Sequence, residues 1–374
     1  MTSPELSRAA ARVDLGAVER NCARLRSELQ GPAELCVVVK ADGYGHGAVE
    51  CAGAALAGGA TWLAVAAALE ARELRRAFPE ARLLVMGALT QSELEIALEA
   101  DADIAVWRPA FARAAAERAA AFGAPARVHV KYDSGMGRLG ERDPEAVLAL
   151  VAEVGADDRL ELAGFWTHFA TADEPDSGFF AEQLASFREL ANRVRDARPG
   201  VTIHAANSAA TLRDAGCHFD LVRCGVAAYG LDPFQRDPFA QGLEPALELR
   251  SYVADVKRFA QGASAGYGRR WRAPSERWVA VLPIGYGDGV RRALGNNADV
   301  LVGGSRHPVV GTISMDNLTV DLGPDTDVVP GDVAVLIGAQ GDERILCEEV
   351  AARLDTINYE ITCGTSKRVP RHYA

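Results

Sequence analysis

The stretch Leu35–Gly47, L-C-V-V-V-K-A-D-G-Y-G-H-G, joins a Val-rich apolar run to a glycine-rich turn. An apolar run flanked by turn residues predicts a buried strand. Lys40 stands where this strand ends, and in α/β proteins the carboxyl ends of the strands border the ligand site. Burial there would lower the pKa of the lysine and make its amine a nucleophile for carbonyl groups, including the aldehyde of pyridoxal phosphate. The alternative is a solvated lysine at a strand end.

Composition excludes several classes of protein. The chain has 374 residues, 49% of them hydrophobic, and a net charge of −11, which suits a globular protein without a nucleic-acid-binding surface. Its 7 cysteines lack C-x-x-C spacing, as expected for reduced thiols rather than disulfides or zinc ligands. We find neither a signal peptide nor an apolar run long enough for a bilayer. The sequence therefore predicts a cytoplasmic protein with no membrane or nucleic-acid partner.

The first two thirds of the sequence alternate strand patterns with helix patterns. Helical periodicity marks Leu15–Leu29, Ala68–Phe78, Pro144–Val154 and Phe180–Arg198. Parallel strands need crossover helices, so the alternation predicts a parallel sheet, and eight units in about 200 residues favour a closed (β/α)8 TIM-type barrel. The expected strands are Leu35–Val39, Thr61–Ala66, Arg82–Gly87, Asp103–Trp107, Ala126–Lys131, Leu160–Trp166, Val201–Ala205 and Phe219–Arg223.

The pattern changes after residue 240. Strand-like runs separated by Gly, Pro, Asn and Asp predict a mainly antiparallel β domain. We therefore expect a barrel domain over residues 1–240 and a β domain over 241–374, with residues 1–14 as a candidate strand of the β domain. The expected C-terminal strands are Leu247–Phe259, Trp278–Pro283, Val300–Val302, Val309–Ile313, Leu318–Asp321 and Val333–Ile337, followed by a helix over Cys347–Leu354.

Polar residues gather at the carboxyl ends of five expected barrel strands. Catalytic groups of TIM barrels lie at this end, and phosphate often binds after the last two strands. Small polar residues there could offer donors to a phosphate. The residues in question are Lys40 and Tyr44, Lys131, His168, Asn207 and Ser208, and Arg223 and Gly225.

Each of these residues also has a structural interpretation. Capping, turn formation and ion pairing are common roles at strand ends. Their coincidence at five strand ends favours a functional site. The structural alternatives are a satisfied histidine at His168, capping by Asn207 and Ser208, a turn shaped by Gly135 and Gly137, and ion pairs of Arg223 with Asp220 or Asp214 and of Lys131 with Asp133.

The motifs around these positions resemble those of alanine racemases, the barrel-type (fold type III) pyridoxal phosphate enzymes. They occur in family order over nearly the whole chain. The resemblance implies an isomerase that interconverts L-alanine and D-alanine and supplies D-alanine for peptidoglycan. The motifs are V-V-V-K-A-D-G-Y-G-H-G, K-Y-D-S-G-M-G-R-L-G, W-T-H-F-A-T-A-D, A-A-N-S-A, V-R-C-G-V-A-A-Y-G, S-A-G-Y-G, I-G-Y-G-D-G, G-T-I-S-M-D-N and I-N-Y-E-I-T-C-G-T-S-K-R-V-P-R.

By this resemblance, two bases act on opposite faces of the substrate Cα. Lys40 would hold pyridoxal phosphate covalently and act on one face, and Tyr267 would act on the other. In the family this tyrosine comes from the second subunit of a homodimer. A free tyrosine has a pKa of about 10, so it needs a helper, expected to be His168 linked through Arg223. Arg223 would face the pyridine nitrogen as a permanent donor and leave it unprotonated.

The resemblance also implies the remaining contacts. Arg138 would bind the cofactor phenolate and the substrate carboxylate, fixed by a carbamylated Lys131. Met315 and Asp316 would contribute from the partner subunit, and Tyr286 would line the entrance. The implied cofactor-binding set is Lys40, Tyr44, Arg138, His168, Asn207, Ser208, Arg223, Gly225, Val226 and Tyr359, with phosphate held by Tyr44, Ser208, Gly225, Val226 and Tyr359.

Other substrates and other functions stay open at this point. Departures from the family pattern at Arg269, Val290 and Ser314 leave serine or a larger amino acid as alternative substrates. A decarboxylase or a non-catalytic pyridoxal phosphate carrier would share part of the architecture. Two further alternatives are a dinucleotide-dependent oxidoreductase using Gly43, Gly45, Ala48 and Glu70, and a metal-dependent hydrolase using His129, Lys131, His168 and His204.

Overall fold

The structure is a computed structural model that describes residues 7–374. These residues form two compact units. The first, here called the barrel unit, comprises Val18–Tyr44 and Ala48–Ala228. The second, here called the β unit, comprises the chain up to Ala17, Gly45–Gly47 and Tyr229–Ala374. The predicted boundary between a barrel domain and a β domain at residue 240 stays a prediction. Within residues 7–374, we find no helix whose length and apolar content would let it cross a membrane.

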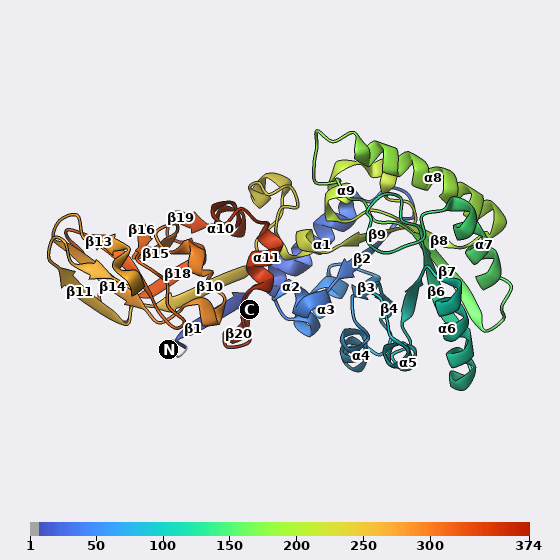
Figure 1. Ribbon diagram of the computed structural model, residues 1–374, viewed down its shortest axis with the longest axis horizontal. Helices are drawn as coiled ribbons and strands as arrows, with labels where there is room; N and C mark the ends of the chain where they lie inside the picture. Colours follow the sequence, from blue (N-terminus) through green and yellow to red (C-terminus); the bar gives the residue numbers. More distant parts are fainter. Residues whose placement is uncertain (1–6) are drawn as a thin grey trace. The chain divides into compact units, whose positions relative to one another are not determined.

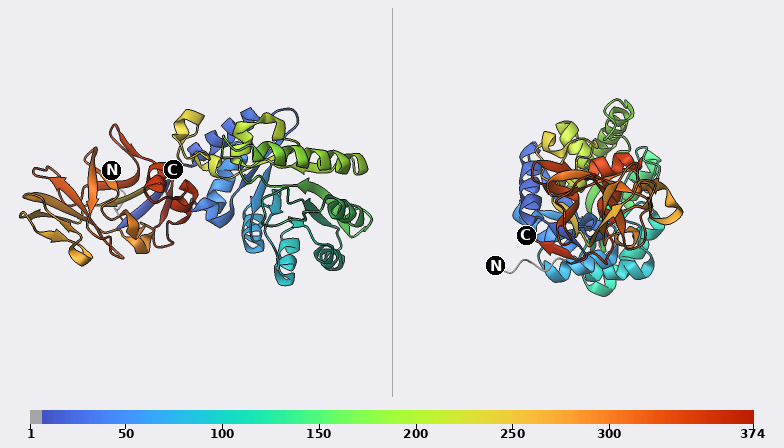
Figure 2. Two further views of the ribbon diagram at one scale, coloured as in Figure 1. Left: turned by 45° about the horizontal axis from the view of Figure 1, so that its top comes forward. Right: turned by 90° about the vertical axis from the view of Figure 1, so that its left-hand side faces the viewer.

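The barrel unit is built around a closed ring of eight parallel strands, which confirms the predicted TIM-type fold. Helices lie outside the ring in Figure 1 and in the left-hand view of Figure 2. The strands are β2 (Glu34–Val38), β3 (Trp62–Val65), β4 (Arg82–Val85), β5 (Asp103–Val106), β6 (Ala126–Lys131), β7 (Leu160–Trp166), β8 (Thr202–His204) and β9 (Leu221–Cys224). The helices are α1 (Leu15–Glu28), α2 (Lys40–Tyr44), α3 (Ala48–Ala57), α4 (Ala68–Ala77), α5 (Gln91–Glu99), α6 (Pro109–Phe122), α7 (Pro144–Val154), α8 (Phe179–Ala197) and α9 (Ser208–Arg213).

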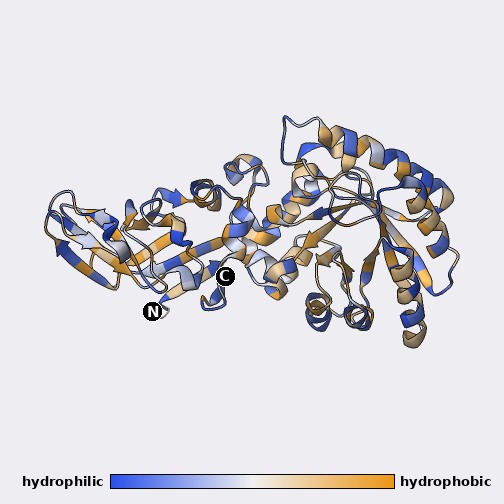
Figure 3. Ribbon diagram, viewed as in Figure 1, coloured by the Kyte–Doolittle hydropathy of each residue, from blue (hydrophilic) through white to orange (hydrophobic). Residues whose placement is uncertain are grey.

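The helices of the barrel unit pack through one apolar face. In α8, the side chains of Phe180, Leu184, Phe187 and Val194 are buried, and hydrophilic residues occupy the other face (Figure 3). Phe187 stacks on Phe165 of β7 with ring centroids 5.3 Å apart. The 3.6-residue period of the sequence therefore places the apolar stripe against the strands, where burial stabilises the unit by about 25 cal/mol per Å².

The β unit contains a largely antiparallel sheet in the order β11-β14-β17-β16-β15-β18-β10-β1-β20, with β19 paired to β18. The N-terminal strand β1 lies between β10 (antiparallel) and β20 (parallel), so segments from the two ends of the chain share this sheet. A separate hairpin pairs β12 with β13. The strands are β1 (Ala9–Val13), β10 (Leu247–Tyr252), β11 (Asp255–Phe259), β12 (Ser264–Ala265), β13 (Trp271–Arg272), β14 (Arg277–Leu282), β15 (Asp299–Val302), β16 (Ser305–Val310), β17 (Leu318–Gly323), β18 (Val333–Gln340), β19 (Glu343–Ile345) and β20 (Arg371–Tyr373).

Two predicted strands are partly wrong. For the expected strand Val309–Ile313, the structure has β16 at Ser305–Val310, so only Val309 and Val310 are in a strand. Leu247–Phe259 was expected to be continuous, but it divides into β10 and β11. At the break, the N–H of Val253 donates to Asp332 O (2.8 Å) and the N–H of Ala254 donates to Val281 O (2.8 Å). The chain thus changes partners, from β18 to β14. Burial alternates from Leu247 up to the break at Val253 and Ala254, so the first half of the run gives no sign of it.

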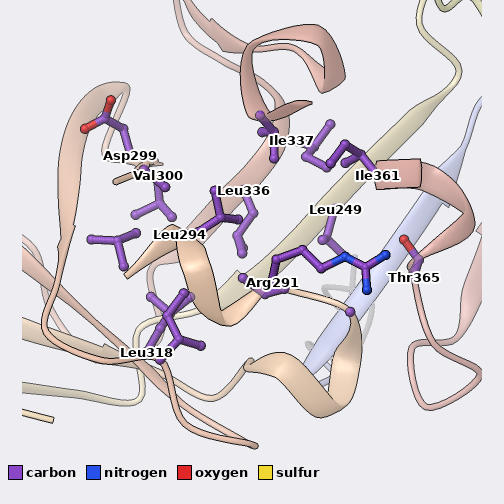
Figure 4. A pocket seen from close by; sticks show the side chains of 16 residues that line it. Leu249, Arg291, Leu294, Asp299, Val300, Leu318, Leu336, Ile337, Ile361 and Thr365 are labelled. Atoms are coloured by element: carbon purple, nitrogen blue, oxygen red, sulfur yellow. The ribbon is translucent and has the colours of Figure 1, made fainter. Parts of the chain in front are cut away.

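Two short helices, α10 (Cys347–Arg353) and α11 (Asn358–Cys363), complete the β unit. A mostly apolar cavity of about 40 Å³ lies in this unit (Figure 4). Leu318, Leu336 and Val300 line it, and the Arg291 side chain reaches across it towards Thr365. The core of the β unit is therefore not completely filled, and a further loss of side-chain volume here would add to an existing void.

We expect Leu318→Ala to destabilise the β unit by about 2–5 kcal/mol, because it removes a buried side chain and enlarges this cavity. Leu318 is only 2% exposed. Denaturant unfolding measures the change, and Val329→Ala, at a position 55% exposed, is the control that should shift the free energy by less than about 0.5 kcal/mol. Equal effects of the two substitutions would contradict this description of the core.

Candidate active site

Lys40 opens a left-handed turn immediately after β2. Ala41, Asp42, Gly43 and Tyr44 all have positive φ angles, of 53°, 56°, 59° and 54°. Side chains other than hydrogen disfavour this conformation by about 1–2 kcal/mol each, so surrounding contacts must hold the turn. The N–H of Gly43 donates to Val39 O at 3.0 Å, and Asp42 Oδ1 accepts from the N–H of Ala48 at 3.1 Å. The turn fixes the direction of the chain on both sides of Lys40, whose side chain is half-buried.

The Glu70 carboxylate holds the same turn from α4. It accepts hydrogen bonds from the N–H groups of Ala41 (2.7 Å), Ala66 (3.0 Å) and Ala67 (3.0 Å). Glu70 therefore has a structural role at the base of the site, in place of the ribose contact that the dinucleotide alternative required.

Lys131 ends β6 and is buried, with 2% of its surface exposed. Its Nζ lies 4.2 Å from the centroid of the Trp166 ring. Burial, followed by the nearby cations of Arg223 and Arg138, lowers the pKa of Lys131 to about 7, against the opposing effect of Asp133. A large fraction of this amine is therefore neutral at physiological pH, which is unusual for lysine.

The ion pair considered between Lys131 and Asp133 does not form. Asp133 instead accepts from the N–H groups of Gly135 (3.1 Å) and Gly137 (3.0 Å), and Arg142 Nε donates to it at 3.1 Å. These bonds shape the turn that leads to Arg138, whose side chain is exposed. The two glycines have the turn-forming role that the structural interpretation gave them, with φ angles of 134° and 71°.

Arg223 of β9 is the most constrained cation of the site. Its Nη1 donates to His204 Nδ1 at 2.9 Å, and its Nη2 donates to Thr167 O (2.9 Å), Ala205 O (3.0 Å) and His168 Nδ1 (3.3 Å). Burial lowers the pKa of Arg223 to about 10, which leaves the guanidinium charged at neutral pH. Among the residues that the structure describes, its buried Nε–H has no acceptor. A buried donor without an acceptor is costly, and this one is available to a ligand.

The ion pairs considered for Arg223 are absent from the described residues. Asp220 pairs with Arg195 at 2.7 Å, and Asp214 caps a short turn by accepting from the N–H of Gly216 at 2.8 Å. Arg223 therefore carries its charge into the site without a carboxylate partner.

His168 follows β7 and is half-buried. Burial and the cations of Arg223, Arg138, Lys131 and Lys40 hold the pKa of His168 well below its ordinary value. The ring is therefore neutral, as it must be to accept a hydrogen bond from Arg223 at Nδ1. The charged side chains of Arg223 and Arg138 act on this neutral histidine, so the carboxyl end of the barrel is electropositive and suits an anionic ligand.

The loops after β8 and β9 form a compact cradle. Ser208 Oγ accepts from the N–H groups of Gly225 (3.0 Å) and Ala227 (3.3 Å). A Cβ atom on Gly225 would lie 2.3 Å from the Tyr44 hydroxyl oxygen, so only glycine permits this approach. The cradle thus brings two hydroxyl groups and the backbone of one loop together without an intervening side chain.

Asn207 and Val226 flank this cradle. Asn207 caps α9, because its Oδ1 accepts from the N–H of Ala210 at 3.0 Å. Val226 is buried and begins a 3-10 turn, Val226–Tyr229. The side-chain oxygen of Asn207 therefore has the capping role that the structural alternative gave it. A ligand would have to bind the side-chain NH2 group instead.

The predicted residues of the β unit form an exposed group of loops. The side chains of Tyr267, Tyr286 and Met315 are 74%, 43% and 51% exposed. Thr312 Oγ1 donates to Tyr267 O at 2.8 Å, and the N–H of Tyr286 donates to Ser314 O at 3.0 Å. Backbone contacts thus fix these loops while their aromatic and thioether side chains extend into solvent, as expected of a surface that a second molecule covers.

Asp316 and Tyr359 also lie in the β unit. Asp316 pairs with Arg368 at 2.7 Å, and both groups are about half-exposed. Tyr359 is half-buried in α11, where its carbonyl accepts from Thr362 Oγ1 at 3.3 Å. The structure therefore groups the predicted residues in two sets, one in each unit.

Residues 7–374 contain no cluster of three or more His, Cys, Asp or Glu side chains placed to hold a metal ion. His129 and His204, which the hydrolase alternative used, are hydrogen-bonded to each other at 2.8 Å. Sequence analysis did not assign His204 or the carbonyl of Thr167 to Arg223. The available sequence signal was that Thr167 follows the strand β7 and that His204 ends β8. Their contacts with Arg223 depend on how the strands close into the barrel.

Comparison with known proteins gives a consistent result. Residues 13–233 match the family model described as "Alanine racemase, N-terminal domain", and residues 246–373 match "Alanine racemase, C-terminal domain". The chain is 42% identical to an alanine racemase of Symbiobacterium thermophilum, over 97% of this chain and 96% of that protein. It is 39% identical to alanine racemase 1 of Bacillus subtilis, over 97% and 92%. The solved alanine racemase of Streptomyces coelicolor A3(2) superposes with a TM-score of 0.92 at 38% identity, over 98% of each chain.

Proposed function

The chain belongs to the alanine racemase family of isomerases, and from that premise we propose that it interconverts L-alanine and D-alanine with pyridoxal phosphate and two bases. The observation that carries the proposal is the buried Nε–H of Arg223, which lacks an acceptor among the described residues and lies in an electropositive site. A pyridine nitrogen is an acceptor of the required kind.

The residues present fit this cofactor. Arg223 would donate from Nε to the pyridine nitrogen, and the cradle of Tyr44, Ser208 and Gly225 would take the phosphate, together with Val226 and Tyr359. When bound, pyridoxal phosphate withdraws electrons from the substrate Cα and so makes the Cα–H bond acidic. A guanidinium donates a hydrogen bond but keeps its proton, so the pyridine would stay unprotonated.

Racemisation removes a proton from one face of the substrate Cα and returns a proton to the other face. We propose that Lys40 Nζ holds the cofactor covalently and exchanges a proton with one face of Cα. The phenol oxygen of Tyr267, from a partner subunit, would exchange a proton with the other face. The 74% exposure of Tyr267 within a single chain supports its use by a second copy in a homodimer. Neutral His168, bound to Arg223, would assist the tyrosine.

Arg138 and Lys131 would orient the substrate. We propose that Arg138 binds the substrate carboxylate and the cofactor phenolate. We also propose that Lys131 is carbamylated, and that the resulting negative charge holds the Arg138 guanidinium in place. The lowered pKa of Lys131 supports this, because only a neutral amine reacts with carbon dioxide. Met315, Asp316 and Tyr286 of the partner subunit's β unit would complete the entrance. Alanine is the expected substrate. The D-alanine product would be made in the cytoplasm and used for peptidoglycan.

We expect Lys40→Ala to abolish racemisation, because it removes both the cofactor attachment and one base. Chiral chromatography of the protein incubated with pyridoxal phosphate and L-alanine, L-serine or L-lysine measures the activity and its specificity. Lys257→Ala, which removes an exposed lysine paired with Asp255, is the control and should retain full activity. Retained racemisation in Lys40→Ala would refute the proposed role, and preferred turnover of serine or lysine would reassign the substrate.

A site shared between subunits predicts complementation. Hybrid dimers of a Lys40→Ala chain and a Tyr267→Ala chain contain one intact site, so we expect them to recover about half of the wild-type activity. Differently tagged chains can be co-expressed and purified as hybrids. The control hybrid pairs Lys40→Ala with the Lys40→Ala, Tyr267→Ala double variant and has no intact site. Hybrids as inactive as this control would place both bases in one chain.

Carbamylation of Lys131 predicts a ¹³C NMR carbamate signal after addition of ¹³C-bicarbonate. Since the pKa of Lys131 is about 7, the reactive neutral amine is scarce below pH 6 and dominant above pH 8, so the signal should grow across this range. It should vanish in Lys131→Ala and persist in Lys257→Ala. A signal unaffected by Lys131→Ala would show that the carbamate forms elsewhere.

A further inference from the structure

A chain of four buried side chains crosses the interior of the barrel unit. Asp103 Oδ2 lies 2.9 Å from His129 Nε2, His129 Nδ1 lies 2.8 Å from His204 Nε2, and His204 Nδ1 lies 2.9 Å from Arg223 Nη1. The first three side chains are fully buried and Arg223 is 2% exposed. The chain begins at the first residue of β5 and ends near the carboxyl end of β9, beside the proposed cofactor.

The chemistry of its two ends fixes the direction of every hydrogen bond. A guanidinium can only donate, so His204 must accept at Nδ1 and carry its proton on Nε2. That proton is donated to His129 Nδ1, so His129 carries its own proton on Nε2 and donates it to Asp103. Each histidine is therefore neutral with its proton on Nε2, and the chain ends on a carboxylate, which only accepts.

A charged His129 is incompatible with this arrangement. It would donate from Nδ1 to His204 Nε2, and His204 would then accept at both nitrogens, which requires an imidazolate. Burial and the charge of Arg223 hold the pKa of His204 well below its ordinary value, in agreement with a neutral His204. Burial raises the pKa of Asp103, but hydrogen bonds from His129 and Arg127 outweigh it and keep the pKa below its ordinary value.

Arg127 anchors the anionic end of the chain at the protein surface. Its Nε donates to Asp103 Oδ1 at 2.6 Å, and its Nη2 donates to Asp101 Oδ1 at 2.8 Å. The Arg127 side chain is 26% exposed and that of Asp101 is 70% exposed. Asp103 therefore has one oxygen committed to Arg127 and the other to His129.

We infer that Asp103 and His129 are positioning residues for the proposed reaction: through His204 they fix the acceptor that holds Arg223 Nη1 and so keep Arg223 Nε directed at the cofactor pyridine. The chain polarises in one direction, which strengthens each of its bonds. None of these residues except Arg223 touches the reacting groups. The inference rests on the proposed function, because it assigns them a role in holding that cofactor.

Asp103→Asn tests the direction of the chain with minimal change of shape. The asparagine side chain has one acceptor oxygen and one NH2 donor group. Because Arg127 and His129 both donate, the NH2 group must face a donor at one of them. If the amide faces His129, the proton of His129 moves to Nδ1, that of His204 moves to Nδ1, and a donor then meets Arg223 Nη1. If the amide faces Arg127, the outer anchor is lost. Asp101→Asn is the matched control, because it also changes a partner of Arg127 but lies outside the series of hydrogen bonds from Asp103 to Arg223.

The experiment combines ¹⁵N-histidine NMR of the holoenzyme with measurement of pyridoxal phosphate affinity by fluorescence. The chain has 7 histidines, so substitution can assign their signals. We expect Nε2–H tautomers at His129 and His204 in the wild-type protein. In Asp103→Asn we expect an affinity weaker by about tenfold, the equivalent of one lost buried hydrogen bond. Both histidines should become Nδ1–H tautomers when the amide group faces His129, and should keep theirs when it faces Arg127. Asp101→Asn should change neither affinity nor tautomers.

Two results would overturn the inference. One is an Nδ1–H tautomer or a charged ring at either histidine of the wild-type protein, which needs no variant to fold. The other is a folded Asp103→Asn variant with wild-type tautomers and cofactor affinity. Failure of the proposed function is a separate result, because the wild-type protein would then not bind pyridoxal phosphate at all, whatever its tautomers.

Discussion

The buried guanidinium of Arg223 is the constraint on which the site depends. A charge in the interior must be compensated, and here three carbonyl or imidazole acceptors at Nη2 and one imidazole at Nη1 provide this without a carboxylate in contact. The arrangement leaves one donor, Nε, without an acceptor among the described residues. A charge that is compensated by neutral acceptors stays available to polarise a ligand, whereas a directly paired charge would be largely neutralised.

The barrel supplies this geometry because its strands end together. Lys40, Lys131, His168 and Arg223 come from four strands that are distant in sequence but share one end of the ring. The left-handed turn after β2 and the Glu70 carboxylate add a local constraint that costs conformational energy and defines the position of Lys40. Burial, followed by the nearby cations of Arg223 and Arg138, lowers the pKa of Lys131, which leaves much of this amine neutral and nucleophilic.

Much of this could be predicted from the sequence, and the parts that could not have physical reasons. Apolar periodicity located the eight barrel strands, and the motifs around Lys40 and Arg223 identified the family. The break between β10 and β11 was missed because the alternating burial of β10 runs up to it. The left-handed turn was not expected, since Ala41, Asp42 and Tyr44 disfavour positive φ and only tertiary contacts select it. The expected contact between Arg223 and His168 is present. The carboxylates considered as alternative partners of Arg223 have other roles, because Asp220 pairs with Arg195 and Asp214 caps a turn.

The central claim is that Arg223 donates a hydrogen bond to an unprotonated cofactor pyridine. ¹⁵N NMR of the protein loaded with pyridoxal phosphate labelled at the pyridine nitrogen measures this directly. The account predicts the chemical shift of a hydrogen-bonded but unprotonated pyridine over the whole range of pH in which the protein is folded and Arg223 is charged. The chemical shift of a pyridinium at neutral pH would contradict it, because a protonated ring nitrogen has no lone pair with which to accept from Arg223 Nε.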